Sequence, residues 1–277
     1  MKNILSFLLL ITCVLSNAFS KSIHLPKDVQ MEILLDSIDT KLVGNDVYMD
    51  VWERLWIKSN RDLLCFDFMA DSLDVNFVSL ETSSKINDIC WLDNGDMLVA
   101  SDSALLLLDD EGYETISYFP YSKMKITPAD SHSVYVFGET GTKGIYDISL
   151  LDLSGEFTRL FTLTEEVKGI AGNGDISIVA LNKELLLFSR KVEPTVFYRT
   201  NGEIRSIAIT NFGSIFIATS QGLVYFENLE RAYTFCNVGV TKLWNINNKL
   251  YALFDDGIFA LIHQVENFKD FTKDVSE

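Results

Sequence analysis

The sequence repeats itself at intervals of 36 to 43 residues, and this repeat restricts the possible folds more than any other feature. The two most similar copies begin at Ile86 and Ile204, where INDICWLDNGDMLVASDSALLLL and IRSIAITNFGSIFIATSQGLVYF align without a gap. Each copy contains a strand, a turn with a glycine (Gly95 or Gly213), and a second strand rich in β-branched and aromatic residues. A repeat of this length is typical of one four-stranded propeller blade.

Four weaker copies extend the pattern to six, and they begin at Tyr48, Met124, Val167 and Val240. A further apolar segment lies between successive copies and is expected to form a fourth strand in each repeat. Frequent turn signals leave no long stretch with the period of a helix. The sequence therefore predicts an all-β fold, a six-bladed β-propeller of four-stranded antiparallel blades over residues 47–272.

A propeller must also close its ring, because an unpaired sheet edge invites association with other chains. The N-terminal segment at 21–46 contains a strand-like core within residues 27–38. We expect this core to supply the outer strand of the last blade, for which residues 266–272 are the competing candidate. The alternative is that the core packs beneath the propeller. Residues 273–277 are assigned to a C-terminal tail.

Residues 1–20 have the layout of a secretory signal peptide, in which Lys2 precedes an apolar run and the small residues Ala18 and Ser20 precede a cleavage site. The run is shorter than the roughly 20 residues that a membrane span needs. The sequence LITC, which ends at Cys13, also resembles a lipoprotein box, and acylation of Cys13 would anchor the protein to a membrane. We expect an exported protein that is periplasmic, associated with the outer membrane or secreted.

The formal net charge of −16 argues against nucleic-acid binding, because an acidic chain repels the phosphate backbone. Metal sites and nucleophilic triads often use histidine, but the three histidines share no motif. Cys65, Cys90 and Cys236 lie in apolar strand-like runs and are expected to be small buried hydrophobic residues. The main interpretation therefore includes no cofactor.

The segment IRSIAITNFGSIFIATSQGL resembles the repeat of bacterial two-component-regulator propellers and, more broadly, six-bladed propellers of the NHL and gluconolactonase type. This resemblance concerns the fold, since one fold serves many functions. It also implies an alternative chemistry, because six-bladed lactonases hold a divalent cation in the central channel with acidic and amide side chains from the inner strands.

The two residues after the apolar start of each copy are expected to face the central channel. The candidates from these pairs are Asp50, Asn87, Asp88, Lys125, Lys168, Arg205 and Lys242. Two carboxylates thus meet four basic side chains. This mixture is compatible with salt bridges across the channel, with a pocket for a small anionic or zwitterionic ligand, or with a calcium site formed by Asp50, Asn87 and Asp88.

The main functional hypothesis is an exported, non-catalytic binding or scaffolding propeller that recognises a protein or peptide partner in the cell envelope. It depends on the predicted export, the predicted fold and the lack of a catalytic motif. The alternative is a divalent-metal-dependent lactonase or hydrolase that acts in the central channel. Membrane contact is expected only if Cys13 is lipidated.

Overall fold

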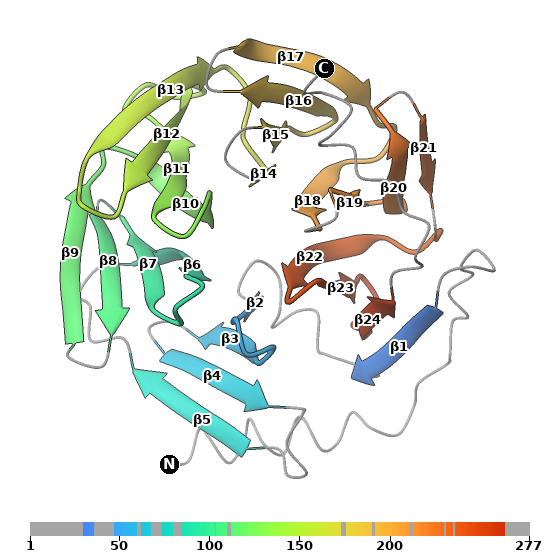
Figure 1. The fold of residues 1–277 in the computed structure, drawn as a ribbon, viewed down its shortest axis with the longest axis horizontal. Helices are drawn as coiled ribbons and strands as arrows, with labels where there is room; N and C mark the ends of the chain where they lie inside the picture. Colours follow the sequence, from blue (N-terminus) through green and yellow to red (C-terminus); the bar gives the residue numbers. More distant parts are fainter. Residues whose placement is uncertain are drawn as a thin grey trace.

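The computed structural model is a ring of six four-stranded antiparallel sheets, the six-bladed β-propeller that the repeat predicts (Figure 1). It describes residues 30–35, 47–59, 62–67, 74–79, 85–102, 104–109, 112–172, 176–189, 192–210, 213–229, 231–234 and 236–263. The predicted signal peptide, Cys13, the predicted tail and the competing outer strand at 266–272 lie outside these residues. Within the described part of the chain, no helix is long and apolar enough to cross a membrane.

The first three blades each contain four consecutive strands, ordered from the central axis outward. Blade 1 contains β2 (Val47–Met49), β3 (Leu55–Ser59), β4 (Asp62–Asp67) and β5 (Asp74–Ser79). Blade 2 contains β6 (Ile86–Trp91), β7 (Met97–Ser101), β8 (Ala104–Asp109) and β9 (Gly112–Tyr118). Blade 3 contains β10 (Ser122–Pro128), β11 (Ser133–Glu139), β12 (Tyr146–Asp152) and β13 (Phe157–Leu163).

Blades 4 and 5 follow the same order, and blade 6 takes its fourth strand from elsewhere in the chain. Blade 4 contains β14 (Gly169–Gly172), β15 (Ile176–Ala180), β16 (Glu184–Ser189) and β17 (Val192–Arg199). Blade 5 contains β18 (Ile204–Ile209), β19 (Ile215–Thr219), β20 (Gly222–Asn228) and β21 (Arg231–Thr234). Blade 6 contains β22 (Val240–Ile246), β23 (Lys249–Phe254) and β24 (Phe259–His263).

The outer strand of blade 6 is β1 (Gln30–Leu35), which pairs antiparallel with β24. In Figure 1 the blue β1 lies beside the red β24, so the two ends of the described chain meet in one sheet. His263 Nε2 lies 3.1 Å from Glu32 Oε2 across this pair. The strand that closes the ring therefore comes from the N-terminal segment.

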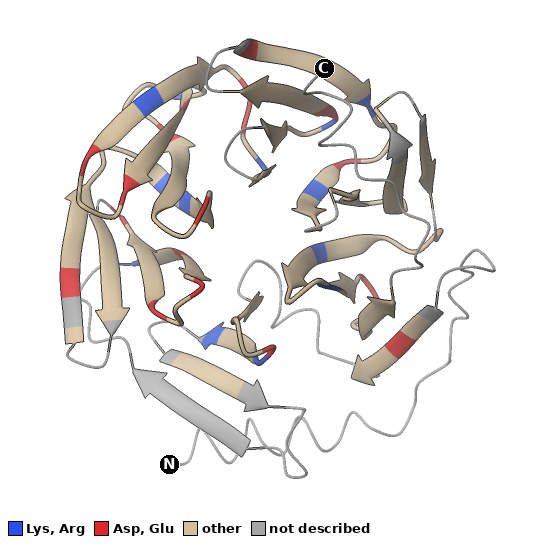
Figure 2. Ribbon diagram, viewed as in Figure 1, with Lys and Arg blue, Asp and Glu red and all other residues tan. Residues whose placement is uncertain are grey.

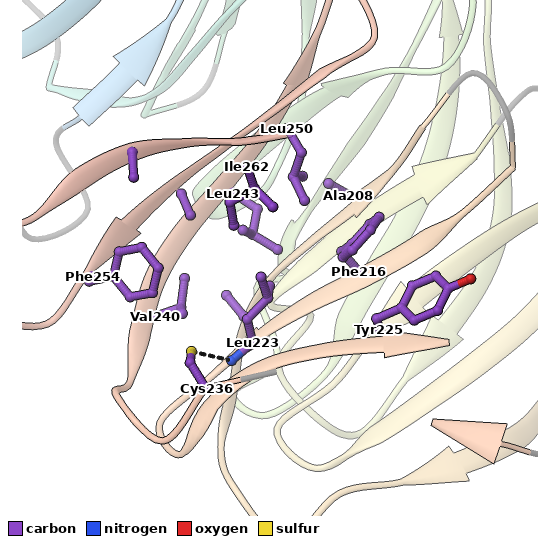
Figure 3. Close-up of a cluster of buried hydrophobic side chains, with 13 residues drawn as sticks. Ala208, Phe216, Leu223, Tyr225, Cys236, Val240, Leu243, Leu250, Phe254 and Ile262 are labelled. Atoms are coloured by element: carbon purple, nitrogen blue, oxygen red, sulfur yellow. Dashed lines mark hydrogen bonds between the residues drawn. The ribbon is translucent and has the colours of Figure 1, made fainter. Parts of the chain in front are cut away.

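The hydrophobic core lies between neighbouring blades, because each sheet packs both faces against other sheets. All residues of β7 and of β19 are buried, as expected for strands that are apolar on both faces. Figure 3 shows one such layer, in which Phe216 and Leu223 of blade 5 pack with Leu243 and Leu250 of blade 6. Burial of each large side chain contributes about 1.5–3 kcal/mol. The fold is thus held by interfaces between blades.

The glycine-containing turns of the repeat have the conformation that glycine favours. Gly95 and Gly213 have φ angles of 95° and 78°. Each turn is closed by the same backbone bond, from Leu92 N–H to Asp96 O in blade 2 and from Thr210 N–H to Ser214 O in blade 5. Residues that make this bond occupy equivalent positions, so the bond can be used to align the inner strands of different blades.

Candidate functional site: the central channel

The inner strands of the six blades surround a central cavity of about 390 Å³. Six of the seven residues expected in the channel line this cavity: Asn87, Asp88, Lys125, Lys168, Arg205 and Lys242. Figure 2 shows basic segments on β10, β18 and β22, which are inner strands and lie nearest the centre of the ring. The cavity is the place where the charged residues of separate blades come together.

A β-bulge explains why two consecutive residues of one inner strand can both face the cavity. The register between the first and second strands shifts at the same point in blades 2, 5 and 6. A bulge places two residues opposite one and redirects a side chain. The bulged pairs that line the cavity are Asn87 and Asp88, Arg205 and Ser206, and Thr241 and Lys242.

Asp50 is the exception, and its expected position in the channel needs correction. Its N–H donates to Arg54 O, as Leu92 N–H donates to Asp96 O, so Asp50 corresponds to Leu92 at the turn. Because β2 is short, its apolar residues match the repeat in more than one register. The register chosen from the sequence put Asp50 near the start of the inner strand, but it lies at the end. Asp50 lies at the end of the inner strand, outside the residues that line the cavity.

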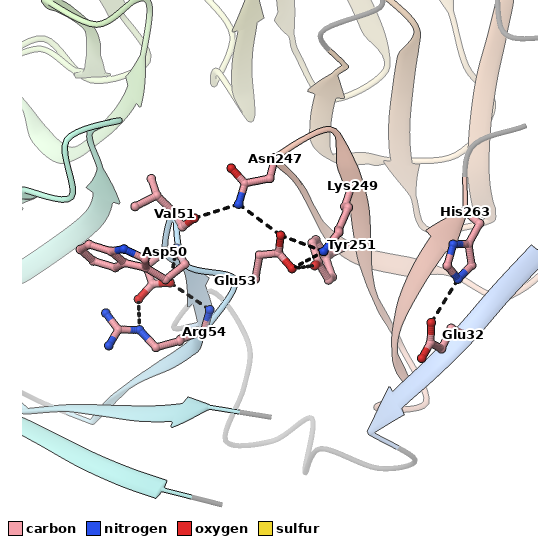
Figure 4. A network of polar contacts seen from close by, with 10 residues as sticks. Glu32, Asp50, Val51, Glu53, Arg54, Asn247, Lys249, Tyr251 and His263 are labelled. Atoms are coloured by element: carbon pink, nitrogen blue, oxygen red, sulfur yellow. Dashed lines mark hydrogen bonds and ion pairs between the residues drawn. The ribbon is translucent and has the colours of Figure 1, made fainter. Parts of the chain in front are cut away.

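The Asp50 carboxylate is completely buried and serves as an acceptor for the turn that it begins. It accepts hydrogen bonds from Trp52 N (3.0 Å), Arg54 N (2.9 Å), Arg54 Nε (2.7 Å) and Trp56 Nε1 (2.7 Å). Figure 4 shows this group next to Glu53, at the boundary between blades 1 and 6. Four donors use the acceptor capacity of both oxygens, so the role of Asp50 is structural.

Asp88 differs from Asp50 because its carboxylate belongs to the cavity wall. Its Oδ2 accepts one hydrogen bond from Ile126 N of the next blade, at 3.1 Å. Burial raises the pKa of Asp88, and the opposing effects of Lys242, the Ile126 N–H, Lys125 and the Ile89 N–H do not cancel this rise. Asp88 is therefore a carboxylate with enhanced basicity beside open space.

Blade 5 offers an internal comparison for the hydrogen bond of Asp88. Ser206 Oγ accepts a hydrogen bond from Leu243 N of the next blade at 3.2 Å, which is the same kind of link between inner strands. A neutral hydroxyl is thus sufficient to join two blades here. The link between the blades does not require the negative charge of Asp88, so the presence of a carboxylate here needs another explanation.

Two of the four basic residues are neutralised by acidic residues near the cavity. Lys168 Nζ lies 3.0 Å from Glu166 Oε2 and 3.6 Å from Glu203 Oε1. Burial alone lowers the pKa of Lys168, but the hydrogen bond and charge of Glu166, together with Glu203, raise it overall. Arg205 pairs with Asp255. The acidic partners are Glu166, Glu203 and Asp255, and not the carboxylates of Asp50 and Asp88 that the sequence placed opposite these basic residues.

The other two basic residues act on Asp88. Lys242 Nζ donates to Val47 O at 2.7 Å and lies 4.3 Å from the centre of the Tyr48 ring. The Lys125 side chain makes no hydrogen bond or ion pair with another described residue, and its charge acts on the carboxyl groups of Asp88 and Glu166. Two ammonium groups, that of Lys242 held by its contacts and that of Lys125 open, therefore act electrostatically on the same carboxylate.

The lining also has an apolar part, which was not among the predicted channel residues. Trp244 packs against the hydrophobic core and also lines the cavity two residues after Lys242 on the same strand. Alternation along a strand places residues two apart on the same face, and this signal identifies Trp244. Ile209 and Ile246 line the same part of the cavity, near the ends of β18 and β22.

The residues present do not fit a divalent cation. A calcium ion takes six to eight oxygen ligands, but Asp50 is committed to the turn and Lys242 and Lys125 act on Asp88. Over the described residues, no group of three or more His, Cys, Asp or Glu side chains has an arrangement that could hold a metal ion. The proposed ligand set of Asp50, Asn87 and Asp88 therefore does not come together.

No protein-family model and no curated protein matches the sequence. Solved propeller structures do match. A structure solved as a proposed gluconolactonase has a TM-score of 0.64 at 13% identity and covers 90% of this chain and 99% of its own. A calcium-binding regucalcin from Agrobacterium tumefaciens gives 0.61 at 15% identity, covering 86% and 95%. A gluconolactonase from Xanthomonas campestris gives 0.63 at 10% identity, covering 87% and 93%.

These neighbours correct the main functional hypothesis. The gluconolactonases and the regucalcin correspond to the alternative, a lactonase or hydrolase acting in the channel, and not to the expected non-catalytic binding or scaffolding propeller. Other similar propellers come from solved protein complexes. At these identities the similarity shows a shared fold, so the reaction has to be argued from the channel.

Proposed function

We propose that this protein hydrolyses a lactone or a similar small ester in its central channel, with Asp88 as the general base. The observation that carries the proposal is the environment of Asp88, a carboxylate of raised pKa in the lining of a cavity that also contains Lys125 and Lys242, whose charges act on it. A general base works best when its pKa lies near the working pH, and carboxylates reach that range by burial.

The reaction needs one carboxylate and one water molecule. Ionised Asp88 takes a proton from water as the oxygen of that water attacks the ester carbonyl carbon. The carbonyl π electrons move onto oxygen, and the resulting tetrahedral oxyanion then re-forms the carbonyl and breaks the bond to the ring oxygen. Protonated Asp88 returns its proton to this leaving oxygen, so that a hydroxy acid forms and Asp88 is regenerated.

The two ammonium groups supply the electrostatic part of catalysis. Negative charge develops on the carbonyl oxygen during the reaction, and fixed positive groups that face it lower the barrier. Lys242 is well suited because Val47 O and the Tyr48 ring hold its ammonium group in place. In the proposed mechanism Lys242 and Lys125 therefore perform the role that a metal ion has in a metal-dependent lactonase.

The calcium-dependent alternative predicts that removing metal abolishes hydrolysis, whereas the lysine-assisted mechanism predicts that it does not. Regucalcin, one of the similar structures, is described as calcium-binding. Since the described channel residues do not form a calcium site, we expect hydrolysis to continue after dialysis against EDTA and to be unchanged by added calcium. Loss of activity in EDTA with recovery in calcium would replace the lysine-assisted mechanism by a metal-dependent one.

The experiment that tests the proposal is hydrolysis of a panel of lactones, followed by proton release, with the wild-type protein and with Asp88→Asn. The variant keeps an oxygen that accepts the Ile126 N–H but removes the base, so we expect kcat to fall about 10²- to 10⁴-fold. For the wild type, the rate should rise with pH through the pKa of Asp88, because only the ionised form accepts a proton.

A matched control is Asp256→Asn, which changes an exposed carboxylate outside the cavity lining. We expect it to leave kcat within about twofold of the wild type, because Asp256 lies in the turn between the second and third strands of blade 6. The proposal fails if Asp88→Asn remains fully active, or if no lactone or ester in the panel is hydrolysed faster than in buffer.

We also propose that the protein acts after export, as residues 1–20 predict. The mass of the mature N-terminus, measured on protein purified from the natural host, tests this proposal. Cleavage after Ser20 supports export of an unanchored protein, and an acylated Cys13 supports a membrane anchor. An intact N-terminus contradicts export.

A further inference from the structure

The two ends of the central channel differ in chemistry. All six sheets have the same order from the axis outward, so their inner strands run the same way along the channel. Residues near the strand starts therefore lie at one end, and residues near the strand ends lie at the other. From Arg205 to Ile209 the distance along a strand is about 13 Å, at roughly 3.3 Å per residue.

The first end is basic and polar. The lining residues near the strand starts are Asn87, Lys125, Lys168, Arg205 and Thr241. Lys168 and Arg205 are paired with acidic residues there, whereas Lys125 has no hydrogen bond or ion pair to another described residue. Lys125 is thus the basic group at this end that is open to an anionic ligand.

The second end is more apolar than the first. Its lining residues are Val51, Trp91, Pro128, Gly172, Ile209 and Ile246, together with the polar Thr127 and Asn245 and with Asp93 as the one charged side chain among the described lining residues there. The Asn245 amide donates to Ile209 O at 3.1 Å. Trp244 lies between the two ends on β22, and its indole ring centroid is 5.7 Å from Lys242 Nζ. An aromatic and aliphatic wall of this kind binds apolar groups and offers few partners to hydroxyls.

From this polarity we propose that the ligand is an amphipathic acid, with its carboxylate near Lys125 and Lys242 and its apolar chain directed towards Trp244, Ile209 and Ile246. The corresponding substrates are lactones or esters that carry an apolar chain, in contrast to polyhydroxylated sugar lactones. A sugar lactone has more hydroxyls than the few polar side chains at that end can pair. The inference about the ligand follows from the lining, while its role as reaction product depends on the proposed function.

The binding test compares octanoate with two probes that each lack one half of its chemistry, using titration calorimetry. Octanamide keeps the chain without the charge, and acetate keeps the charge without the chain. We expect octanoate to bind at least about tenfold more tightly than either probe. Lys125→Gln should weaken octanoate about tenfold and leave octanamide unchanged, whereas Ile209→Asn should weaken both.

The matched control is Lys143→Gln, because Lys143 is an exposed lysine of a hairpin loop outside the cavity. It should not change the affinity for octanoate, which separates a local effect of Lys125 from a change in total charge. Equal binding of octanoate and acetate, or equal weakening by Lys125→Gln and Lys143→Gln, would overturn the inference.

Hydrolysis then distinguishes the ligand from the reaction. If both proposals hold, γ-octalactone has a kcat/KM at least about tenfold above that of glucono-1,5-lactone, and Asp88→Asn removes the hydrolysis. If octanoate binds as expected but no lactone is hydrolysed, the ligand inference stands and the proposed reaction fails. A preference for glucono-1,5-lactone would sink the ligand inference while supporting the reaction.

Discussion

Two carboxylates are buried at the boundary between blades 1 and 6, and one is half-buried in the channel wall, and they differ in how many donors they receive. Asp50 accepts four hydrogen bonds, and Glu53 accepts hydrogen bonds from Asn247, Lys249 and Tyr251 (Figure 4). Asp88 accepts one hydrogen bond from the Ile126 N–H and another from the Ile89 N–H, and it also lines the cavity.

The difference shows in the pKa values. Burial alone would raise the pKa of Glu53, but the hydrogen bonds from Lys249, Tyr251 and Asn247 outweigh it and lower the pKa. For Asp88 burial prevails and the pKa rises. A buried carboxylate with a full set of hydrogen-bond donors stabilises the fold. A carboxylate with fewer donors keeps a higher pKa and can act as a general base.

The largest effect is expected at the most completely paired carboxylate. Asp50→Ala leaves the buried Trp56 Nε1–H and two backbone N–H groups without their acceptor, which should lower the free energy of unfolding by about 3–5 kcal/mol. Urea denaturation measures this change. Asp93→Ala, at an exposed position, should change the free energy by no more than about 0.5 kcal/mol. Similar losses in the two variants would show that Asp50 is not a structural centre.

The pH dependence of stability should be weaker in Glu53→Gln. Because folding lowers the pKa of Glu53, its ionised form stabilises the fold above its ordinary pKa of 4.5, and this contribution is lost as the pH falls through the lower folded value. The variant should lose about 1–3 kcal/mol at pH 7 and show a smaller further loss between pH 5 and 3. Urea denaturation at pH 7, 5 and 3 measures these changes. If the urea midpoints of both proteins fall with pH by the same amount, the prediction is contradicted.

The channel carboxylate should tolerate replacement by a neutral acceptor. Asp88→Ser reproduces the Ser206 link, whereas Asp88→Ala leaves the Ile126 N–H unpaired, so we expect Ala to be less stable than Ser by about 1 kcal/mol. Thermal unfolding of both variants tests this ordering. An Asp88→Ser protein as unstable as Asp50→Ala would remove the distinction between the two kinds of carboxylate.

An effect as small as this is expected at the Gly95 turn of blade 2, which lies against Trp52 of blade 1. A Cβ on Gly95 would overlap the Trp52 ring, but Trp52 is 54% exposed and can move aside. The remaining cost of Gly95→Ala is the positive φ, about 1 kcal/mol. Gly141→Ala is the matched control, since its Cβ would meet nothing within 4 Å. If Trp52→Ala rescues Gly95→Ala completely, the cost is steric and not conformational.

Much of the fold could be predicted because the repeat is a long-range signal that a single sequence contains. The channel positions in blades 2 to 6 follow from counting residues after each apolar start, and the bulges keep two consecutive residues on the cavity wall. Counting failed at Asp50 because β2 is short and its apolar residues match the repeat in more than one register.

Other parts of the site could not be predicted from local patterns. The partners Lys168 and Glu203 lie on different blades, as do Arg205 and Asp255, and no sequence motif connects them. That the charge of Asp88 is not needed to join two blades is seen only when its hydrogen bond to Ile126 is compared with the hydrogen bond between Ser206 and Leu243. This comparison requires the structure. The polarity of the channel requires the common direction of the inner strands, which is a property of the ring.

The pairing of β1 with β24 also sets the order of events when the chain is made. Glu32 and His263 are separated by 231 residues, so the first described strand must wait until nearly all of the chain has been synthesised before it finds its partner. Until then blade 6 has an open edge, and the loop to be closed spans the whole ring. Completion of the ring is therefore expected to be a late and slow step, during which the protein depends on dilution or on chaperones to avoid pairing with other molecules.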